Sequence, residues 1–441
     1  IFYLCFSSSS FFNSEKENKL IMNEIYLTIF FISLLLFLLG TGVWVALSMI
    51  AVSAIGMLLF TTRPVGDAMA TTIWGTSSSL TLTALPLFVW MGEILFRTKL
   101  SENLFKGLSP WLSKLPGGLI HVNVVGCALF AAISGSSAAT VATVGKMSIP
   151  ELRKRKYPEK LLLGSLAGSG TLGLLIPPSI ILIIYGVTIE DSIAKLFMAG
   201  ILPGIMIALL FMTYVVIWSI LNKKLMPNNT QNFSFSEKIK RSKQLLPVVL
   251  LIVSVIGSIY TGVATATEAA SLGVVGALIL SWFQKTLNKK TFKLSLLGAT
   301  KTSCMIAFIL AGSTFLSLAM GFTGLPRNLA IWIEEMSLSP YMLIFILTIF
   351  YIILGMFLDG ISAVVLTMAI IEPMIRQAGF DMIWFGIYLV IVVEMAQITP
   401  PVGFNLFVLQ GMANKDMAFI AKSAFPLILL MILAIVIIII F

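Results

Sequence analysis

The chain has little charge, little histidine and little cysteine, and these shortages exclude most kinds of soluble protein. Charged residues occupy 11% of its 441 positions, whereas soluble globular domains carry about 25%. Three cysteines (Cys5, Cys127 and Cys304) and the single His121 cannot build a disulfide framework, a zinc cluster or a catalytic triad. The sequence also has no HExxH segment, no Walker motif and no cofactor-ligand spacing. We therefore expect no enzyme, no cofactor and no transition-metal site.

Apolar residues dominate instead, at 58% of the chain. Runs of about 20 apolar residues, the length that crosses a bilayer as a helix, recur from Ile25 to the C-terminus. The net charge of +10 comes from Lys and Arg residues in short loops, which is the positive-inside pattern of an inner-membrane protein. This pattern does not indicate nucleic-acid binding. The sequence predicts an all-α polytopic protein of the bacterial inner membrane, embedded in the lipid bilayer.

The chain is predicted to contain two copies of one unit, 22–221 and 246–441. They are joined by a polar segment, 222–245, which is expected to be a cytoplasmic loop. Prolines recur at an offset of 223 residues, in the pairs Pro150 and Pro373, Pro177 and Pro400, Pro178 and Pro401, and Pro203 and Pro426. Internal repeats of this kind are typical of transporters. The segment 1–21 precedes the first methionine and lacks signal-peptide features, so we expect a non-native or disordered leader.

Charge predicts that the two copies are inverted. Residues 97–116 hold four basic and one acidic residue (net +3), and 146–160 hold six basic and two acidic (net +4). The matching 321–340 and 369–383 each hold one basic and two acidic residues (net −1). By the positive-inside rule the first pair is cytoplasmic and the second periplasmic, and the basic segment 285–300 is expected to be a cytoplasmic loop.

Two apolar stretches are predicted to be re-entrant helical hairpins. The stretch 117–149 lies between two cytoplasmic segments and is interrupted at Ser134–Ser137, while its counterpart 341–372 is interrupted at Asp359–Gly360. With these hairpins we expect about ten full crossings. Close helix packing is the alternative explanation for a Gly/Ser cluster in a membrane helix.

A span broken by two prolines follows each hairpin, at 161–186 and 384–411. Proline frees backbone carbonyls of the preceding turn, and inside a bilayer these are tolerated where they line a cavity or meet a ligand. Sodium is a hard cation that binds such oxygens, so one sodium site is predicted at each tip and break. Helix N-termini at the tips also suit a carboxylate substrate. Glu394 and Glu268 are expected to face the protein interior, and a structural role is favoured for Glu268.

The motifs resemble the large membrane (permease) subunit of tripartite ATP-independent periplasmic (TRAP) transporters over about residues 25–440. They are Ala131–Thr140, Ile149–Tyr157, Ile176–Ile180, Lys195–Gly204, Thr265–Ala269 and Ile398–Gly403. Two departures are Ala266, where the family usually has proline, and Gly40–Trp44, where a proline usually follows the glycine.

This resemblance implies an elevator-type ion-transporter fold, sodium as the coupling ion and two protein partners. The partners are a small four-helix membrane subunit and a periplasmic substrate-binding protein, which delivers a small organic acid such as a C4-dicarboxylate, sialic acid or another sugar acid. It also implies binding residues. The first sodium site would use Ser134, Gly135, Ser137, Gly173, Ile176 and Pro177, the second Asp359, Gly360, Ser362, Thr399, Pro400 and Val402, and the substrate Ser136 and Asn405.

Two other functions are compatible with the residues. One is a stand-alone sodium- or proton-coupled carboxylate carrier of the same superfamily. The other is the membrane subunit of an enzyme or of an energy-coupled complex, against which the missing enzymatic motifs argue.

Overall fold

The computed structural model describes residues 27–440 apart from 28, 99, 228–232, 244, 325–338, 357 and 401–402. The predicted leader 1–21 and Val402 therefore lie outside the described residues. All regular elements in the described ranges are helices, as the apolar composition predicts. The chain divides into two compact units, of which unit 2 comprises Ser79–Ile306, Tyr341–Val364 and Phe380–Phe441. Unit 1 comprises Ile1–Ser78, Ala307–Pro340 and Val365–Gly379.

Unit 1 holds α2 (Val45–Phe60), α3 (Val65–Ser77) and the later part of α15 (Lys289–Thr323). Its core contains the fully buried Met57 and Phe315, against which Met69 of α3 packs. Side chains from three helices are thus removed from solvent together, which stabilises the packing of α3 on α2 and α15.

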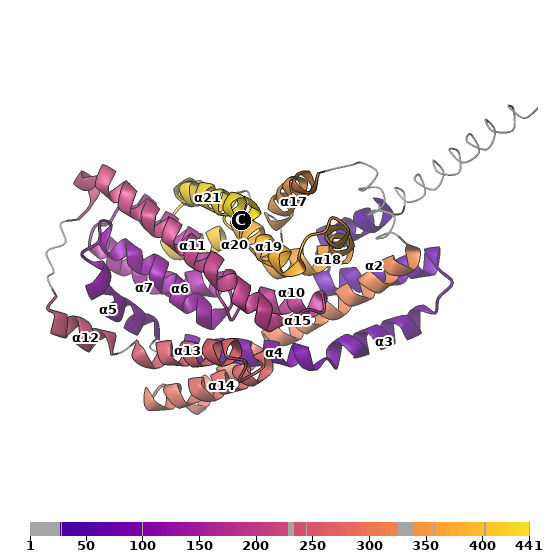
Figure 1. Cartoon of the computed structure of the whole chain (residues 1–441), viewed down its shortest axis with the longest axis horizontal. Helices are drawn as coiled ribbons and strands as arrows, with labels where there is room; N and C mark the ends of the chain where they lie inside the picture. The colour runs from indigo at the N-terminus through magenta and orange to yellow at the C-terminus, as the bar shows by residue number, and fades with distance from the viewer. Residues whose placement is uncertain are drawn as a thin grey trace, which may run out of the picture. The chain divides into compact units, whose positions relative to one another are not determined.

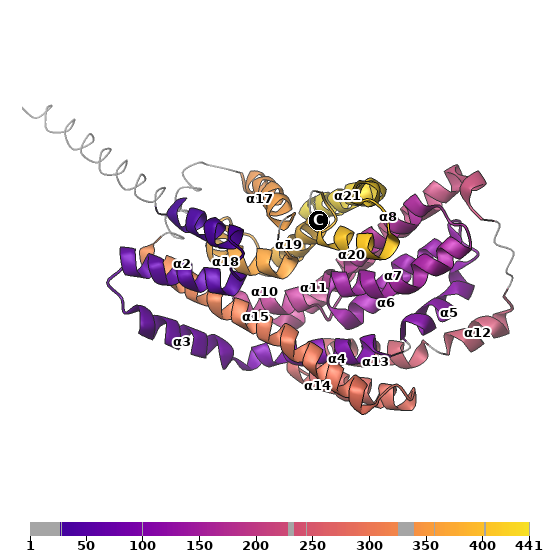
Figure 2. The same ribbon diagram turned by 180° about the vertical axis from the view of Figure 1, so that it is seen from behind.

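Unit 2 contains the first predicted hairpin as the helix pair α6 (His121–Ser134) and α7 (Ser137–Lys154), which lie side by side in Figures 1 and 2. The chain reverses at Gly135, which has a left-handed backbone (φ 57°) that suits glycine. Ser136 then caps α7, because its hydroxyl accepts a hydrogen bond from the Ala139 amide at 3.4 Å. The Gly/Ser interruption thus ends one helix and begins the next.

The first predicted broken span is broken in the structure. It consists of α8 (Glu159–Gly170), the single turn α9 (Leu172–Leu175) and α10 (Ile180–Thr188), with a bend of 40°. Pro177 and Pro178 occupy the break, where they cannot donate backbone hydrogen bonds. Ser179 caps α10 by accepting a hydrogen bond from the Leu182 amide at 3.4 Å.

The second half repeats these helix boundaries. It contains α17 (Pro340–Gly355), α18 (Gly360–Gln377), α19 (Met382–Ala396), α20 (Phe404–Ala413) and α21 (Met417–Ile440). The helices α18, α19, α20 and α21 begin 223 or 224 residues after α7, α8, α10 and α11 (Ile193–Leu221). The proline offset read from the sequence is therefore also an offset between helix starts.

The remaining elements of unit 2 are α4 (Ala84–Phe96), α5 (Leu100–Leu112), α12 (Phe235–Ser242), α13 (Leu246–Tyr260), α14 (Ala266–Phe283) and the first part of α15. Three short 3-10 turns, η1 (Leu80–Thr83), η2 (Gly118–Ile120) and η3 (Lys223–Leu225), connect them. Helix α4 packs against α14, and α5 against α12.

Two predicted loops were wrong in part. The connecting segment 222–245 contains helix α12, which starts with a capping box formed by Ser234 and Glu237. The segment 285–300 is mostly helical, because α15 begins at Lys289 and continues to Thr323. Both segments are rich in lysine, a good helix former, so polarity alone did not indicate a loop.

Five described helices are long and apolar enough to cross a membrane, or eight if each bent pair counts as one span. The expected count was about ten crossings. Six further apolar helices have 10–17 residues, which is shorter than a full crossing, and they include α17, α19 and α20.

The charge asymmetry makes the topology testable. In a background without the three native cysteines, we expect Lys154→Cys, at the end of α7, to react with a membrane-impermeant thiol reagent only from the cytoplasm. Gln377→Cys, at the end of α18, should react only from the periplasm. Both positions are exposed. Reaction of both variants from the same side would contradict the inverted arrangement.

Candidate functional site

The tip of the first hairpin lies directly on the break of the first broken span. A Cβ atom on Gly173 of α9 would lie 2.7 Å from both the carbonyl oxygen of Ser136 and the Cα of Ser137. A Cβ atom on Gly135 would lie 3.2 Å from the carbonyl oxygen of Pro178. Backbone therefore meets backbone on both sides of the tip, and glycine at these two positions permits the approach. The structure brings the residues predicted for the first sodium site together.

Oxygen atoms gather at this tip. The hydroxyls of Ser134 and Thr140 are 2.8 Å apart, and the Thr140 hydroxyl donates to the carbonyl of Ser136 at 2.8 Å. Thr140 was not among the predicted site residues. Its position in the first turn of α7, four residues after the capping Ser136, is the signal that could have identified it. The tip thus offers several neutral oxygens within a small volume, as a hard cation requires.

The second tip contacts both broken spans. A Cβ atom on Gly360 would lie 3.0 Å from Cγ1 of Val393, 3.1 Å from Nε2 of Gln397 and 3.4 Å from Cδ1 of Leu174. Val393 lies in α19 and Gln397 directly follows that helix, whereas Leu174 lies in α9 next to Gly173. The short helix α9 therefore contacts the first tip through Gly173 and the second tip through Leu174.

Asp359 and Ser362 have local roles at this tip. The Ser362 amide donates to Oδ2 of Asp359 at 3.2 Å, so Asp359 caps the N-terminus of α18. Ser362 is 2% exposed. A carboxylate that accepts from its own helix still has lone pairs for a cation, because each oxygen accepts more than one bond.

The second break spans residues 397–403. The amide of Asn405 donates to the carbonyl of Gln397 at 3.1 Å across the break. Gly403 has a left-handed backbone (φ 54°), and a Cβ atom there would lie 3.0 Å from the carbonyl oxygen of Thr399. The Thr399 hydroxyl donates to the carbonyl of Met395 at 2.7 Å, which leaves its lone pairs available. Pro400 is exposed.

Two buried polar side chains lie near the tips, and the amide of Asn405 has no hydrogen-bond partner among the described residues. They are Glu394, which is 1% exposed, and Asn405, which is 0% exposed. Glu394 lies beside Ser137 of the first tip. Buried polar groups are nearly always satisfied, and an acidic side chain inside a membrane protein marks a functional site. The expectation that Glu394 faces the interior is confirmed, and Asn405 was a predicted substrate contact.

Glu268 does not face the interior as expected. It is exposed, and its carboxylate accepts from the amide of Thr265 at 2.8 Å, completing a capping box at the start of α14. The favoured structural role is therefore confirmed, while the predicted burial was wrong. The Thr-x-x-Glu spacing is itself a capping signal and could have placed this side chain at the helix end.

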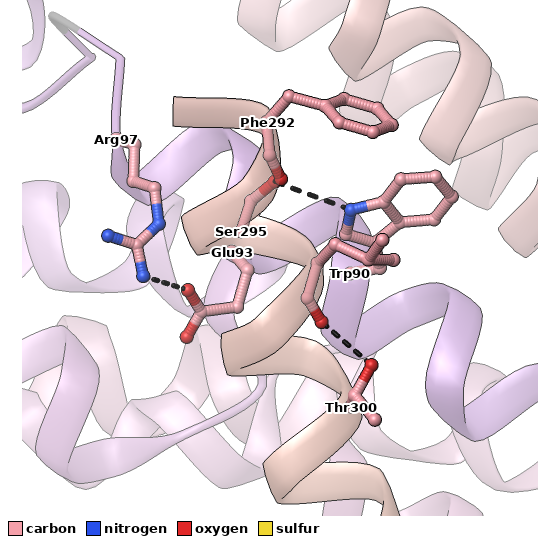
Figure 3. Close-up of polar contacts among 7 residues, drawn as sticks. Trp90, Glu93, Arg97, Phe292, Ser295 and Thr300 are labelled. Atoms are coloured by element: carbon pink, nitrogen blue, oxygen red, sulfur yellow. Dashed lines mark hydrogen bonds and ion pairs between the residues drawn. The ribbon is translucent and has the colours of Figure 1, made fainter. Parts of the chain in front are cut away.

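Glu93 and Arg97 form an ion pair of 2.7 Å at the end of α4, beside helix α15 (Figure 3). A Cβ atom on Gly298 of α15 would lie 2.6 Å from the Glu93 carboxylate. The nearby Trp90 indole donates to the Ser295 hydroxyl at 3.4 Å. The pair and the indole thus fix the end of α4 against α15.

Comparison with known proteins agrees with the helical architecture. The family described as "Tripartite ATP-independent periplasmic transporter, DctM component" matches residues 31–441. The C4-dicarboxylate TRAP transporter large permease protein DctM of Pseudomonas aeruginosa is 33% identical over 386 residues, which cover 87% of this chain and 90% of that protein. The isethionate TRAP transporter permease protein DctMQ of Oleidesulfovibrio alaskensis is 32% identical over 372 residues, covering 83% of this chain and 57% of that protein.

A third relative, the sialic acid TRAP transporter large permease protein SiaM of Vibrio cholerae, is 29% identical over 393 residues, which cover 88% of this chain and 91% of that protein. Among solved structures, the YdaH transporter of Alcanivorax borkumensis superposes with a TM-score of 0.62. The superposition covers 88% of this chain and 94% of that one, at 13% identity. This last likeness concerns the fold alone.

Proposed function

Because this chain belongs to the DctM family of TRAP transporters, a family of permeases, it is a multi-pass protein of the bacterial inner membrane and not an enzyme; we propose that it imports a small organic acid with the sodium gradient. The observation that carries the proposal is the contact of each hairpin tip with a broken span. Gly173 and Leu174 of α9 meet one tip each, so the two tips lie on neighbouring residues of one short helix.

We propose one sodium site at each tip. The first comprises Ser134, Gly135, Ser137, Gly173, Ile176 and Pro177, and the second comprises Asp359, Gly360, Ser362, Thr399, Pro400 and Val402. The clustered hydroxyls at the first tip and the free lone pairs of Thr399 support this assignment. The buried carboxyl group of Glu394 beside Ser137 would supply a further oxygen close to the first cation.

The substrate is proposed to lie between the two tips, in contact with Ser136 and Asn405. The buried amide of Asn405 has neither its donor nor its acceptor paired among the described residues, so it is free to bind a polar ligand. The N-terminus of α7 at Ser136 favours an anion. Relatives are named for C4-dicarboxylate, sialic acid and 2,3-diketo-L-gulonate, which supports a C4-dicarboxylate or a sugar acid as substrate.

An elevator mechanism with inverted repeats fits the helix boundaries. The offset of 223 or 224 residues between the helix starts of the two halves supports a duplicated unit, and the opposite charge of matching segments supports its inversion. In this mechanism the two hairpins would move with the bound acid against the remaining spans.

Two protein partners are proposed: a small membrane subunit and a periplasmic substrate-binding protein. The family is described as tripartite. This chain covers only 57% of the isethionate permease DctMQ, so that relative contains further sequence that could serve as the second membrane component.

Reconstituted uptake tests this function directly. We expect uptake to require sodium, the small subunit and the acid-loaded binding protein, and to accelerate with an inside-negative potential. Each net positive charge moved inward gains about 2.3 kcal/mol per 100 mV. Uptake of free acid without the binding protein would favour the stand-alone carrier instead, and full activity on a proton gradient without sodium would contradict sodium coupling.

A further inference from the structure

Unit 2 contains a cavity of about 910 Å³ whose charged lining is entirely basic. Arg97 and Lys146 supply the charge, Thr143 and Asn288 supply neutral polar groups, and no Asp or Glu of the part of the chain that the structure describes lines the cavity. A neighbouring cavity of about 480 Å³ shares Lys146 and adds Arg153. The lining therefore suits an anion.

Lys146 is the free cation of this cavity. Its side chain is exposed and has no ion-pair partner among the described residues. Arg97 and Arg153 are partly neutralised by Glu93 and Glu159, at 2.7 Å and 2.8 Å. An unpaired ammonium inside a concave site attracts anions more strongly than one on a flat surface, because the low-dielectric walls focus its field.

Thr143 provides a hydrogen-bond donor at the same place. It is 6% exposed, it lines the cavity, and its hydroxyl has no partner among the described residues. Threonines in helices usually donate to the carbonyl four residues earlier, as Thr140 does to Ser136. The Thr143 hydroxyl does not, so it is an unpaired donor in the wall of the cavity.

The cavity is connected to the hairpin tip by one face of α7. Ser136, Thr140, Thr143 and Met147 follow one another at steps of four, three and four residues, which places them on the same side of the helix. Lys146 lies about 15 Å from Ser136 along the helix axis. The proposed substrate position and the basic cavity therefore lie along one side of α7.

We propose that this cavity is a carboxylate-binding site on the exit path of the transported acid, with the Lys146 ammonium and the Thr143 hydroxyl as its ligands and Arg97 as a supporting charge. This proposal rests on the proposed transport function. The charge pattern predicts that the end of α7 near Lys146 faces the cytoplasm. The headgroup of an anionic lipid carries a negative charge that the same residues could bind. The test therefore distinguishes a bound organic acid from a bound lipid.

Charge-selective labelling tests the cavity without requiring transport. In a background without native cysteines, Met147→Cys places a thiol on the half-buried lining beside Lys146. In vesicles of neutral phosphatidylcholine, we expect a thiosulfonate reagent with a sulfonate group to react about tenfold faster than its trimethylammonium counterpart. Adding Lys146→Gln should abolish this preference, while Lys195→Gln, an exposed lysine of α11 outside the cavity, should preserve it.

Competition then identifies the anion. Succinate or N-acetylneuraminate should slow the sulfonate reagent in neutral vesicles, and should do so less after Thr143→Val. Protection by phosphatidylglycerol without any protection by either acid would assign the cavity to a lipid headgroup and overturn the exit-site proposal. Equal rates for the two reagents before any Lys146 substitution would also overturn it.

Transport separates this proposal from the proposed function. Lys146→Gln should lower the maximal uptake rate severalfold. The sodium concentration that gives half-maximal uptake should stay the same, and so should the corresponding concentration of loaded binding protein. If the parent protein shows no sodium-driven uptake but retains anion-selective labelling, the transport proposal fails and the anion site stands. If Lys146→Gln transports at the parent rate, the cavity is not on the exit path.

Discussion

Gly173→Ala is expected to reduce uptake at least tenfold while the protein still inserts and folds. The new methyl group would lie 2.7 Å from the Ser136 carbonyl oxygen and from the Ser137 Cα. These are backbone atoms, so no rotamer change relieves the clash. Overpacking of this kind costs about 1–3 kcal/mol, and here it is relieved by pushing the hairpin tip away from the break. The measurement is sodium-dependent uptake per folded transporter.

Gly126→Ala is the matched control in the same hairpin. Its methyl group would meet only Cγ1 of Val144, at 3.8 Å, which is an ordinary contact. Gly360→Ala at the second tip should have an intermediate effect, because its close neighbours are the side chains of Val393, Gln397 and Leu174, which can adjust. Equal activity of Gly173→Ala and Gly126→Ala would show that the close approach of tip and break does not matter for transport.

The apolar runs, the Gly/Ser interruption and the paired prolines predicted helices, a chain reversal and a break where the structure has them, because these signals act locally along the chain. Gly135 and Ser136 end one helix and cap the next by their own conformational preferences. Pro177 and Pro178 break their span because neither can donate a backbone hydrogen bond. The family assignment, drawn from motifs around the same residues, is confirmed by the match over residues 31–441.

Features that depend on contacts between distant segments were not predictable in this way. The sequence placed Gly173 and Leu174 near a break but gave no sign that each contacts a different tip. The free hydroxyl of Thr143 is another example, since a threonine in a helix normally satisfies itself locally. The prediction that Glu268 faces the interior was wrong for a local reason. Its side chain is held at the start of α14 by the capping box with Thr265, although the residues around it are apolar.

Ser137→Ala and Thr399→Val are expected to raise the sodium concentration for half-maximal uptake about tenfold each, which corresponds to about 1.4 kcal/mol. Each change removes one oxygen and keeps the side chain nearly the same size. Thr399 donates its proton to the Met395 carbonyl, so its lone pairs are the part that a cation would use. Since the two proposed sites lie at different tips, the effects should add in the double variant.

Two controls distinguish ligation from packing in these variants. Thr213→Val in α11 removes a hydroxyl that also donates to the carbonyl four residues earlier, at 2.8 Å. Ser109→Ala removes a buried hydroxyl of α5. Neither lies at a tip, so both should leave sodium dependence unchanged. If alanine packs at Ser137 as well as serine and uptake keeps its sodium dependence in both tip variants, the Gly/Ser cluster serves helix packing and the sodium assignments are wrong. The family assignment, which rests on the match over residues 31–441, would still hold.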